Sequence, residues 1–222
     1  MVIEMLSLSP TGANGLNCAD FLILILRLIG GNPRNENEDL IIYHLATLKM
    51  LLQRDFKELA IKHNAMNILI EKLDSNNDKI KMLALDCIAV LCHESFGRLE
   101  GADKGLGLIL CKKLHDPSFE VKIKVAGALA FATIQSETRK ILCKKCIVDV
   151  LMEILENYHF TEGQLASMKV LSNLFEDPDG KPLVAPLKKK IKKIFTNGNV
   201  EVERHKGMLI NLLKKKNKII YL

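Results

Sequence analysis

The chain has 222 residues, of which 48% are hydrophobic, and it carries a formal net charge of +6 without a single tryptophan. A chain of this length can form one or two globular domains or one short solenoid, and it has enough apolar side chains for a continuous core. Since no run of eighteen apolar residues occurs, a membrane-spanning helix is not expected, and we predict no membrane partner.

The first part of the chain contains one weakly periodic segment and one strongly apolar segment. We expect residues 1–17 to form a flexible arm. The apolar segment 21–30 contains Arg27 and follows no basic stretch, so a buried helix over 18–30 is favoured over a signal peptide. Without a secretory signal, the six cysteines are expected to be reduced thiols of a cytoplasmic protein, with a nuclear location left open.

A four-residue helical motif recurs along the chain at nearly constant spacing. Its first and fourth residues are apolar and lie one helical turn apart, and we call it the repeated phrase. A row of basic residues follows it with the same spacing. The phrases begin at Leu48, Ile88, Leu129, Leu171 and Leu209, and the basic row is Lys57, Arg98, Arg139 and Lys181. A period of roughly 40 residues indicates stacked helical units, none of which buries its apolar face alone.

Within a unit, the pattern predicts a short first helix, a break and two longer helices. The breaks fall at Asn64, Gly105 and Cys146, and Asn64 suits a left-handed helix end. Thr161 and Gln164 match a capping box before a third helix. The expected helices are 40–53, 57–63, 65–73, 79–93, 97–104, 106–114, 119–135, 138–145, 147–157, 162–176, 187–195 and 200–213. We predict a solenoid over 18–213, with units near 18–53, 54–95, 96–136, 137–176 and 177–213, and a basic tail over 214–222.

A short helix, a glycine-type break and two longer helices within one such period resemble the armadillo repeat. Ala128-Leu129 and the run 170–174 resemble the third helix of that family, and Arg98 and Arg139 resemble the basic residue that opens its first helix. The resemblance covers about residues 40–213. It implies an all-α, right-handed superhelical solenoid of about four to five armadillo-like repeats.

The resemblance also implies a concave groove that is lined by the third helices and binds another protein. In the family, a ladder of asparagines provides many of the groove hydrogen bonds; the matching positions here are Met50, Val90, Phe131, Asn173 and Asn211. Only the last two are asparagine, and the tryptophan that accompanies the ladder in nuclear-import adaptors is absent, so an import receptor is not expected. Apolar residues at the first three positions suit a helix or another hydrophobic segment. The expected groove residues are Met50, Val90, Phe131, Lys169, Asn173 and Asn211.

The resemblance leads to two candidate functions. Residues 171–183 resemble armadillo proteins of ciliary radial spokes, which implies a cilium, an axoneme or another cytoskeletal assembly. From the repeat itself and the absence of a catalytic set, we predict a non-catalytic protein–protein interaction scaffold that binds a peptide or helix through the concave third-helix face. The alternative is a nucleotide-exchange co-factor of a heat-shock-70 chaperone, which has similar architecture.

The reactive side chains do not form a pattern typical of a catalytic or metal site. Cys143 and Cys146 have metal-binding spacing, but a structural zinc site needs four ligands, and no second pair lies at a suitable distance along the chain. The six histidines are scattered and do not align with a nucleophile. We predict that the protein is not an enzyme and needs no metal or cofactor.

The charge is concentrated at one end of the chain. Residues 181–222 carry a net charge of +10, while the remaining residues carry −4. These lysines either form a solubilising cap of the last repeat or bind an acidic surface such as tubulin. Nucleic acid is not expected as a partner, because few aromatic side chains are available for base stacking. The expected basic patch is Lys188, Lys189, Lys190, Lys192, Lys193, Lys214, Lys215 and Lys216.

Overall fold

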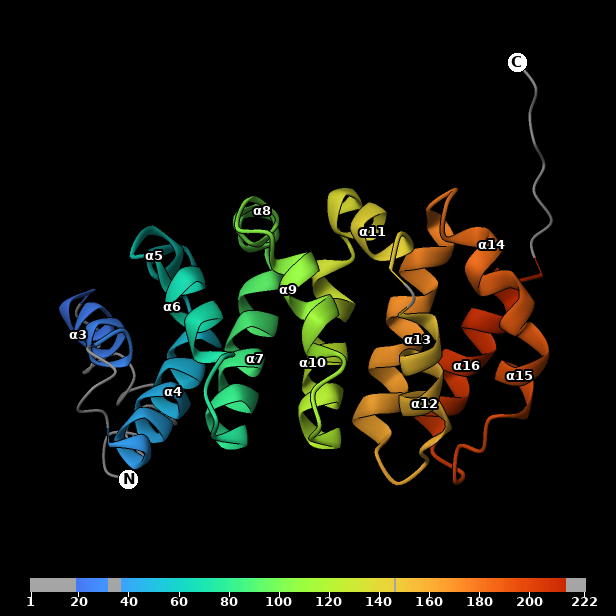
Figure 1. Ribbon diagram of the computed structural model, residues 1–222, viewed down its shortest axis with the longest axis horizontal. Helices are drawn as coiled ribbons and strands as arrows, with labels where there is room; N and C mark the ends of the chain where they lie inside the picture. Colours follow the sequence, from blue (N-terminus) through green and yellow to red (C-terminus); the bar gives the residue numbers. More distant parts are fainter. Residues whose placement is uncertain (1–18, 32–36, 146, 215–222) are drawn as a thin grey trace, which may run out of the picture.

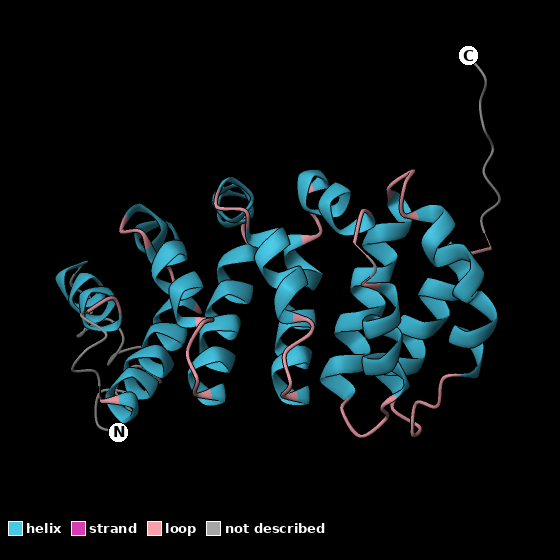
Figure 2. Cartoon of the chain, viewed as in Figure 1, coloured by secondary structure: helices cyan, strands magenta, loops and turns pink. Residues whose placement is uncertain are grey.

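The computed structural model describes residues 19–31, 37–145 and 147–214. The predicted arm over 1–17 and residues 215–222 of the predicted tail lie outside this part of the chain. Figure 2 shows that the regular elements of the described residues are helices. They follow one another along the long axis of the molecule, from α3 at one end to the group of α14, α15 and α16 at the other (Figure 1).

Each middle unit contains two short helices followed by a long one. The middle units are α5 (Lys57–Lys62), α6 (Ala65–Lys72) and α7 (Asp78–Cys92), then α8 (Ser95–Asp103), α9 (Leu106–Lys113) and α10 (Phe119–Ala132), then α11 (Ser136–Cys143), α12 (Val148–Glu156) and α13 (Thr161–Glu176). Before them lie α3 (Ala19–Ile29) and α4 (Glu38–Leu52), and after them α14 (Lys181–Val184), the 3₁₀ turn η2 (Ala185–Leu187), α15 (Lys188–Lys193) and α16 (Val200–Leu212). The expected order of a short first helix and a longer second helix holds for α5 and α6 and for α11 and α12, but α8 has 9 residues and α9 has 8.

Two of the breaks between the first and second helices adopt the conformation that their residue types favour. Asn64 has φ = 64° and Gly105 has φ = 70°, so both lie in the left-handed region. Glycine meets no steric penalty there, and asparagine tolerates the conformation better than most residues. The third break, at Cys146, lies outside the described residues.

The third helices form a continuous layer, in which α4 packs on α7, α7 on α10, α10 on α13 and α13 on α16. The second helices α6, α9, α12 and α15 each pack against the third helix of their own unit. The chain thus has an all-helical solenoid fold. The right-handed sense of the superhelix and the number of repeats stay predictions.

The repeated phrase marks the core between units. Its first residue is at most 1% exposed at every occurrence: Leu48, Ile88, Leu129, Leu171 and Leu209. The fourth residue lies one turn later on the same helix face and is buried in the first four phrases. The period therefore reflects the spacing of side chains that neighbouring units bury against each other.

The basic row has a different physical cause, visible at Arg98 and Arg139. The Arg98 guanidinium donates to the carbonyl oxygens of Cys92 and His93 at 3.0 and 2.8 Å. Arg139 donates in the same way to Thr133 and Ile134 at 2.9 and 2.8 Å. A cation at this position satisfies carbonyls that the last turn of a helix leaves without partners. Each arginine therefore lies in the first turn of a first helix and caps the end of the third helix before it.

The predicted capping box at Thr161 and Gln164 is wrong. Thr161 is already the first helical residue of α13, and Phe160 at the N-cap makes no side-chain hydrogen bond. Gln164 is fully buried and donates to the carbonyl oxygens of Leu155 and Phe195, at 3.0 and 2.9 Å. Its amide thus joins the end of α12 to the loop before α16, which no local pattern could indicate.

Candidate functional site: the third-helix groove

Among the described residues, one face of the third-helix layer has no covering layer, and this face contains two neighbouring hollows. The first has a volume of about 200 Å³ and is lined by residues of α7, α10 and α13. The second has a volume of about 280 Å³ and is lined by α10, α13 and α16 together with Ile134. Phe131 and Lys169 line both hollows, so the two form one continuous depression, which we call the third-helix groove.

Phe131 forms the divide between the two hollows. Its ring lies against the His93 imidazole, with 3.9 Å between ring centroids. On the α13 side, the Lys169 ammonium lies 5.9 Å from the centroid of the Phe131 ring, within the range of a cation–π contact. Partial burial, together with the charge of Lys57, lowers the pKa of His93. The imidazole is therefore mainly neutral at neutral pH.

A row of alternating charges crosses the same face. Lys49 on α4 pairs with Asp86 on α7 at 2.7 Å, Lys124 on α10 pairs with Asp86 at 3.2 Å, and Lys124 pairs with Glu162 on α13 at 2.8 Å. We call these four residues the charge ladder. Burial opposes the charged form of Lys124, but the hydrogen bond with Glu162 and the charge of Asp86 outweigh it and raise the Lys124 pKa. The ladder joins four successive third helices and contains two charges of each sign.

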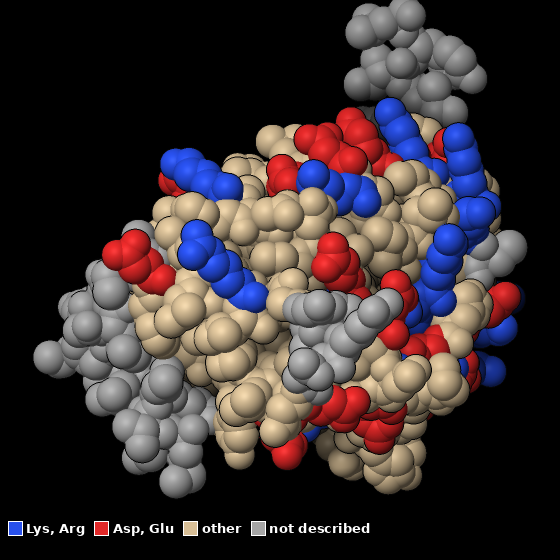
Figure 3. All heavy atoms as spheres, turned by 60° about the vertical axis from the view of Figure 1, so that its left-hand side comes forward, with Lys and Arg blue, Asp and Glu red and all other residues tan. Residues whose placement is uncertain are grey.

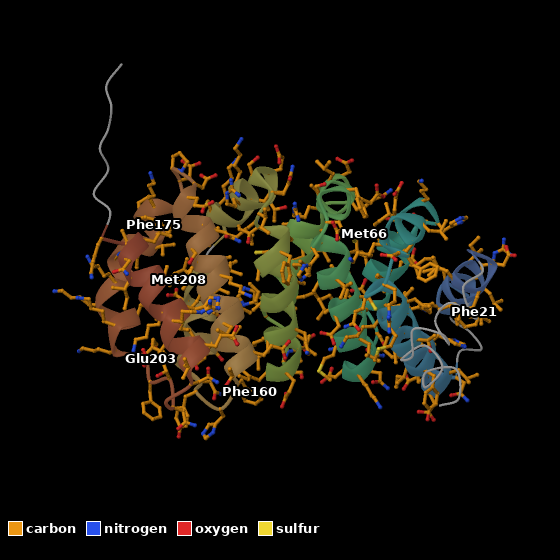
Figure 4. All side chains as sticks on the ribbon, turned by 180° about the vertical axis from the view of Figure 1, so that it is seen from behind. Phe21, Met66, Phe160, Phe175, Glu203 and Met208 are labelled. Atoms are coloured by element: carbon orange, nitrogen blue, oxygen red, sulfur yellow. The ribbon has the colours of Figure 1, made fainter. Side chains whose placement is uncertain are left out.

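The second hollow is largely apolar. Ile134 is 49% exposed and Met208 is 60% exposed, both unusually open for large apolar side chains. Met168 and Phe131 complete the apolar lining. Figure 4 shows the molecule from behind and labels Met208 on α16, the last of the third helices.

The structure brings together three of the six predicted groove residues. Phe131, Lys169 and Asn173 line the second hollow. Met50 and Val90 lie half-buried on α4 and α7, outside the lining of both hollows. Asn211 is exposed on α16, where its side-chain oxygen accepts a hydrogen bond from Lys214.

Asn173 does not present a free amide to the groove. Its side-chain nitrogen donates to the Ala130 carbonyl at 3.1 Å and to Thr133 Oγ1 at 2.8 Å, both at the end of α10. The amide group therefore joins two neighbouring repeats and has already used its donors. A hydrogen bond from this nitrogen to a ligand would require one of these two bonds to break.

Several groove residues were not predicted from the sequence. The charge ladder had a detectable signal, since its members follow one another at close to the repeat period with alternating sign. Ile134 and Met208 gave no such signal, because one follows the end of its helix and the other lies on the last repeat. Their exposure depends on which helix faces remain uncovered by the neighbouring units, and the sequence does not specify those faces.

The predicted basic patch divides into a described and an undescribed part. Lys188 to Lys193 form α15 around the buried Ile191, and Lys189, Lys190, Lys192 and Lys193 are exposed. Lys214 is exposed, while Lys215 and Lys216 lie outside the described residues. Figure 3 shows basic side chains gathered along one edge of the molecule.

Within the described part of the chain, no three His, Cys, Asp or Glu side chains are placed to share a metal ion. Cys87, Cys92 and Cys111 are buried, Cys143 is partly buried, and all four are free thiols. None of the described helices combines the length and hydropathy needed to cross a bilayer.

Comparison with known proteins identifies the fold. No family model matches the sequence, and no curated protein matches it. A designed armadillo repeat protein in complex with the peptide (KR)4 is similar in structure, with a TM-score of 0.79 at 16% identity, covering 95% of this chain and 90% of that one. Computationally designed armadillo repeat proteins for modular peptide recognition give a TM-score of 0.77 at 17% identity, with 95% and 91% coverage. A further designed armadillo repeat protein gives 0.78 at 17% identity, with the same coverage. The fold is therefore of the armadillo type.

Proposed function

We propose that this armadillo-type solenoid is a non-catalytic scaffold that binds a segment of another protein in the third-helix groove. The observation that carries the proposal is the groove itself, in which two hollows run across α7, α10, α13 and α16 on a face that the second helices leave uncovered. The similar designed proteins are described as peptide-recognition modules, which supports a peptide or helix as the occupant.

The shape and chemistry of the groove suit a protein segment. Phe131, Ile134 and Met208 provide an apolar surface, and burial of one large apolar side chain there is worth about 1.5–3 kcal/mol. The charge ladder is fixed by four residues that already pair with each other, so it forms a structured rim. A partner would displace water from the apolar hollow while leaving this rim intact.

Site-specific photocrosslinking tests the proposal in cells. A benzoylphenylalanine in place of Ile134 lies in the groove, while the same group in place of Leu108 lies on α9, among the second helices, as a matched control. We expect a partner that crosslinks from position 134, not from 108, and that is lost when Phe131→Glu is added. Crosslinks of equal yield from both positions, or yields that Phe131→Glu leaves unchanged, would contradict binding in the groove.

We further propose that the basic patch attaches the scaffold to an acidic surface, with the tubulin of a cilium or axoneme as the preferred setting. The resemblance of residues 171–183 to radial-spoke armadillo proteins motivates this setting. Among the described residues, the five lysines of α15 have no carboxylate within 4.0 Å, so their charges add rather than cancel. Faster nucleotide release from a heat-shock-70 ATPase domain would instead favour the exchange-factor function.

A further inference from the structure

The charges that line the third-helix groove are not equally available to a partner. Asp86 is held by two lysines and Lys124 by two carboxylates, so the charge ladder is internally neutralised. Lys169 differs from them. It is exposed, and no carboxylate of the described residues lies within 4.0 Å of its ammonium, which contacts the Phe131 ring instead.

The hollow beside Lys169 combines an apolar floor with a positive rim. Its lining contains Phe131, Ile134, Met168 and Met208 but, within the described residues, neither aspartate nor glutamate. Three other polar side chains line this hollow. Asn173 donates to α10, and the Ser172 hydroxyl donates to the Met168 carbonyl at 2.8 Å. His205 Nδ1 lies 3.0 Å from the Glu201 carbonyl oxygen within α16. Among the described residues that line this hollow, Lys169 is therefore the lysine or arginine available to pair with a carboxylate of a partner.

We propose that the groove selects a protein segment in which a carboxylate lies next to a large apolar side chain. The apolar side chain enters the hollow between Ile134 and Met208, and the carboxylate pairs with Lys169. This inference rests on the proposed function and adds the chemistry of the occupant. Charge complementarity supports it, because a carboxylate meets an unpaired ammonium, whereas a basic side chain meets carboxylates that Lys49 and Lys124 already neutralise.

We expect this groove to disfavour the kind of peptide found in the complex of one structural neighbour. The designed armadillo protein was solved with (KR)4, a peptide of alternating lysine and arginine. In the present groove, Asp86 and Glu162 would have to give up their lysine partners to bind such a peptide. We therefore expect (KR)4 to bind more weakly than an acidic–apolar peptide of equal length.

Selection from a random heptapeptide library displayed on phage tests the inference directly. The full-length protein and the Lys169→Glu variant are used in parallel, with Lys140→Glu on α11 as a matched charge reversal outside the groove. We expect the parent and Lys140→Glu to enrich peptides with Asp or Glu beside Leu, Ile, Met or Phe. We expect Lys169→Glu to enrich Lys or Arg at that place instead.

Affinities of the best parent peptide complete the test. Lys169→Gln should weaken binding about three- to fivefold, in line with an exposed ion pair, and Met208→Ala about tenfold. Thermal unfolding of each variant confirms that it folds. The charge preference would be overturned if the parent enriched basic peptides, or if Lys169→Glu enriched the same peptides as the parent. Either result would leave groove binding in place. If no peptide is enriched, or if Phe131→Glu leaves the affinity unchanged, the proposed function fails as well.

Discussion

The side-chain amide of Asn173 on α13 donates a hydrogen bond of 2.8 Å to Thr133 Oγ1, at the end of the neighbouring α10. Thr133 in turn donates to the Leu129 carbonyl at 2.7 Å, so the pair extends a chain of hydrogen bonds into the buried core. Asn173 occupies a position that the family resemblance assigns to ligand binding. In this protein its amide nitrogen joins two repeats.

Asn173→Ala should therefore destabilise the fold itself. The change leaves Thr133 and the Ala130 carbonyl without this partner, and we expect a loss of about 1–3 kcal/mol in the free energy of unfolding. Asn211→Ala is the control, because Asn211 is exposed and should change stability by less than about 0.5 kcal/mol. Urea unfolding measures both, and equal midpoints for the two variants would show that the inter-repeat bond contributes nothing.

Leu129→Ala tests the phase of the repeat. Leu129 is completely buried and begins one of the repeated phrases. Removing its side chain should cost about 2–5 kcal/mol, from lost apolar burial and the resulting cavity. Thermal unfolding at the same scan rate as the parent is the measurement, and an unchanged midpoint would contradict the assignment of the phrase to the core.

Gly97→Ala should be strongly destabilising, because a β-carbon at this position would lie 2.0 Å from the Leu91 carbonyl oxygen. The close approach allows Arg98, the next residue, to reach the end of α7. Gly207→Ala is the matched control, since apart from its chain neighbours and the adjacent backbone of α16 nothing lies within 4 Å of its β-carbon position. There the substitution should stabilise the helix by about 0.5–1 kcal/mol. Circular dichroism melts that shift in the same direction for both variants would refute the packing argument.

The cysteines should differ in their reactivity toward iodoacetamide at about pH 8. Burial raises the pKa of Cys92 to about 12, and it raises the pKa of Cys87 as well, so both thiols stay protonated and inaccessible. Burial, followed by the charges of Asp177 and Asp179, raises the pKa of the partly buried Cys143. Since the thiolate is the reactive form, these pKa shifts predict that alkylation of the native protein rises with pH.

Mass spectrometry of tryptic peptides should find Cys143 modified before Cys87 and Cys92. Protein unfolded in guanidinium chloride is the control, in which the three thiols should react at similar rates. Modification of Cys92 in the native protein ahead of Cys143 would be inconsistent with the core packing of α7.

The basic patch should bind microtubules in a salt-dependent manner. Exposed charges act over about 8 Å at physiological ionic strength, so co-sedimentation should fall sharply between low and moderate salt. Replacing Lys188, Lys189, Lys192 and Lys193 by glutamine should weaken it without loss of helicity. The control replaces four exposed lysines away from α15: Lys79, Lys112, Lys140 and Lys144. If both quadruple variants co-sediment like the parent at each salt concentration, the patch is a solubilising cap.

The sequence by itself determined the repeat and its helical class. Leu129 and its counterparts recur because each unit must bury the same helix face, and that requirement leaves a period which can be detected without coordinates. The left-handed breaks at Asn64 and Gly105 were also predictable from the sequence, because the steric limits on positive φ favour glycine and asparagine over other residue types.

Only the tertiary structure decided which polar side chains face the groove and which join repeats. Asn173 and Gln164 look like groove and cap residues in sequence, yet their partners lie on other helices or in loops far along the chain. Lys169 and Lys124 lie on the same face, but Lys124 has two carboxylate partners and Lys169 has none among the described residues. Hydrogen bonds and ion pairs depend on distances of a few ångströms between neighbouring helices, and a repeat period does not specify them.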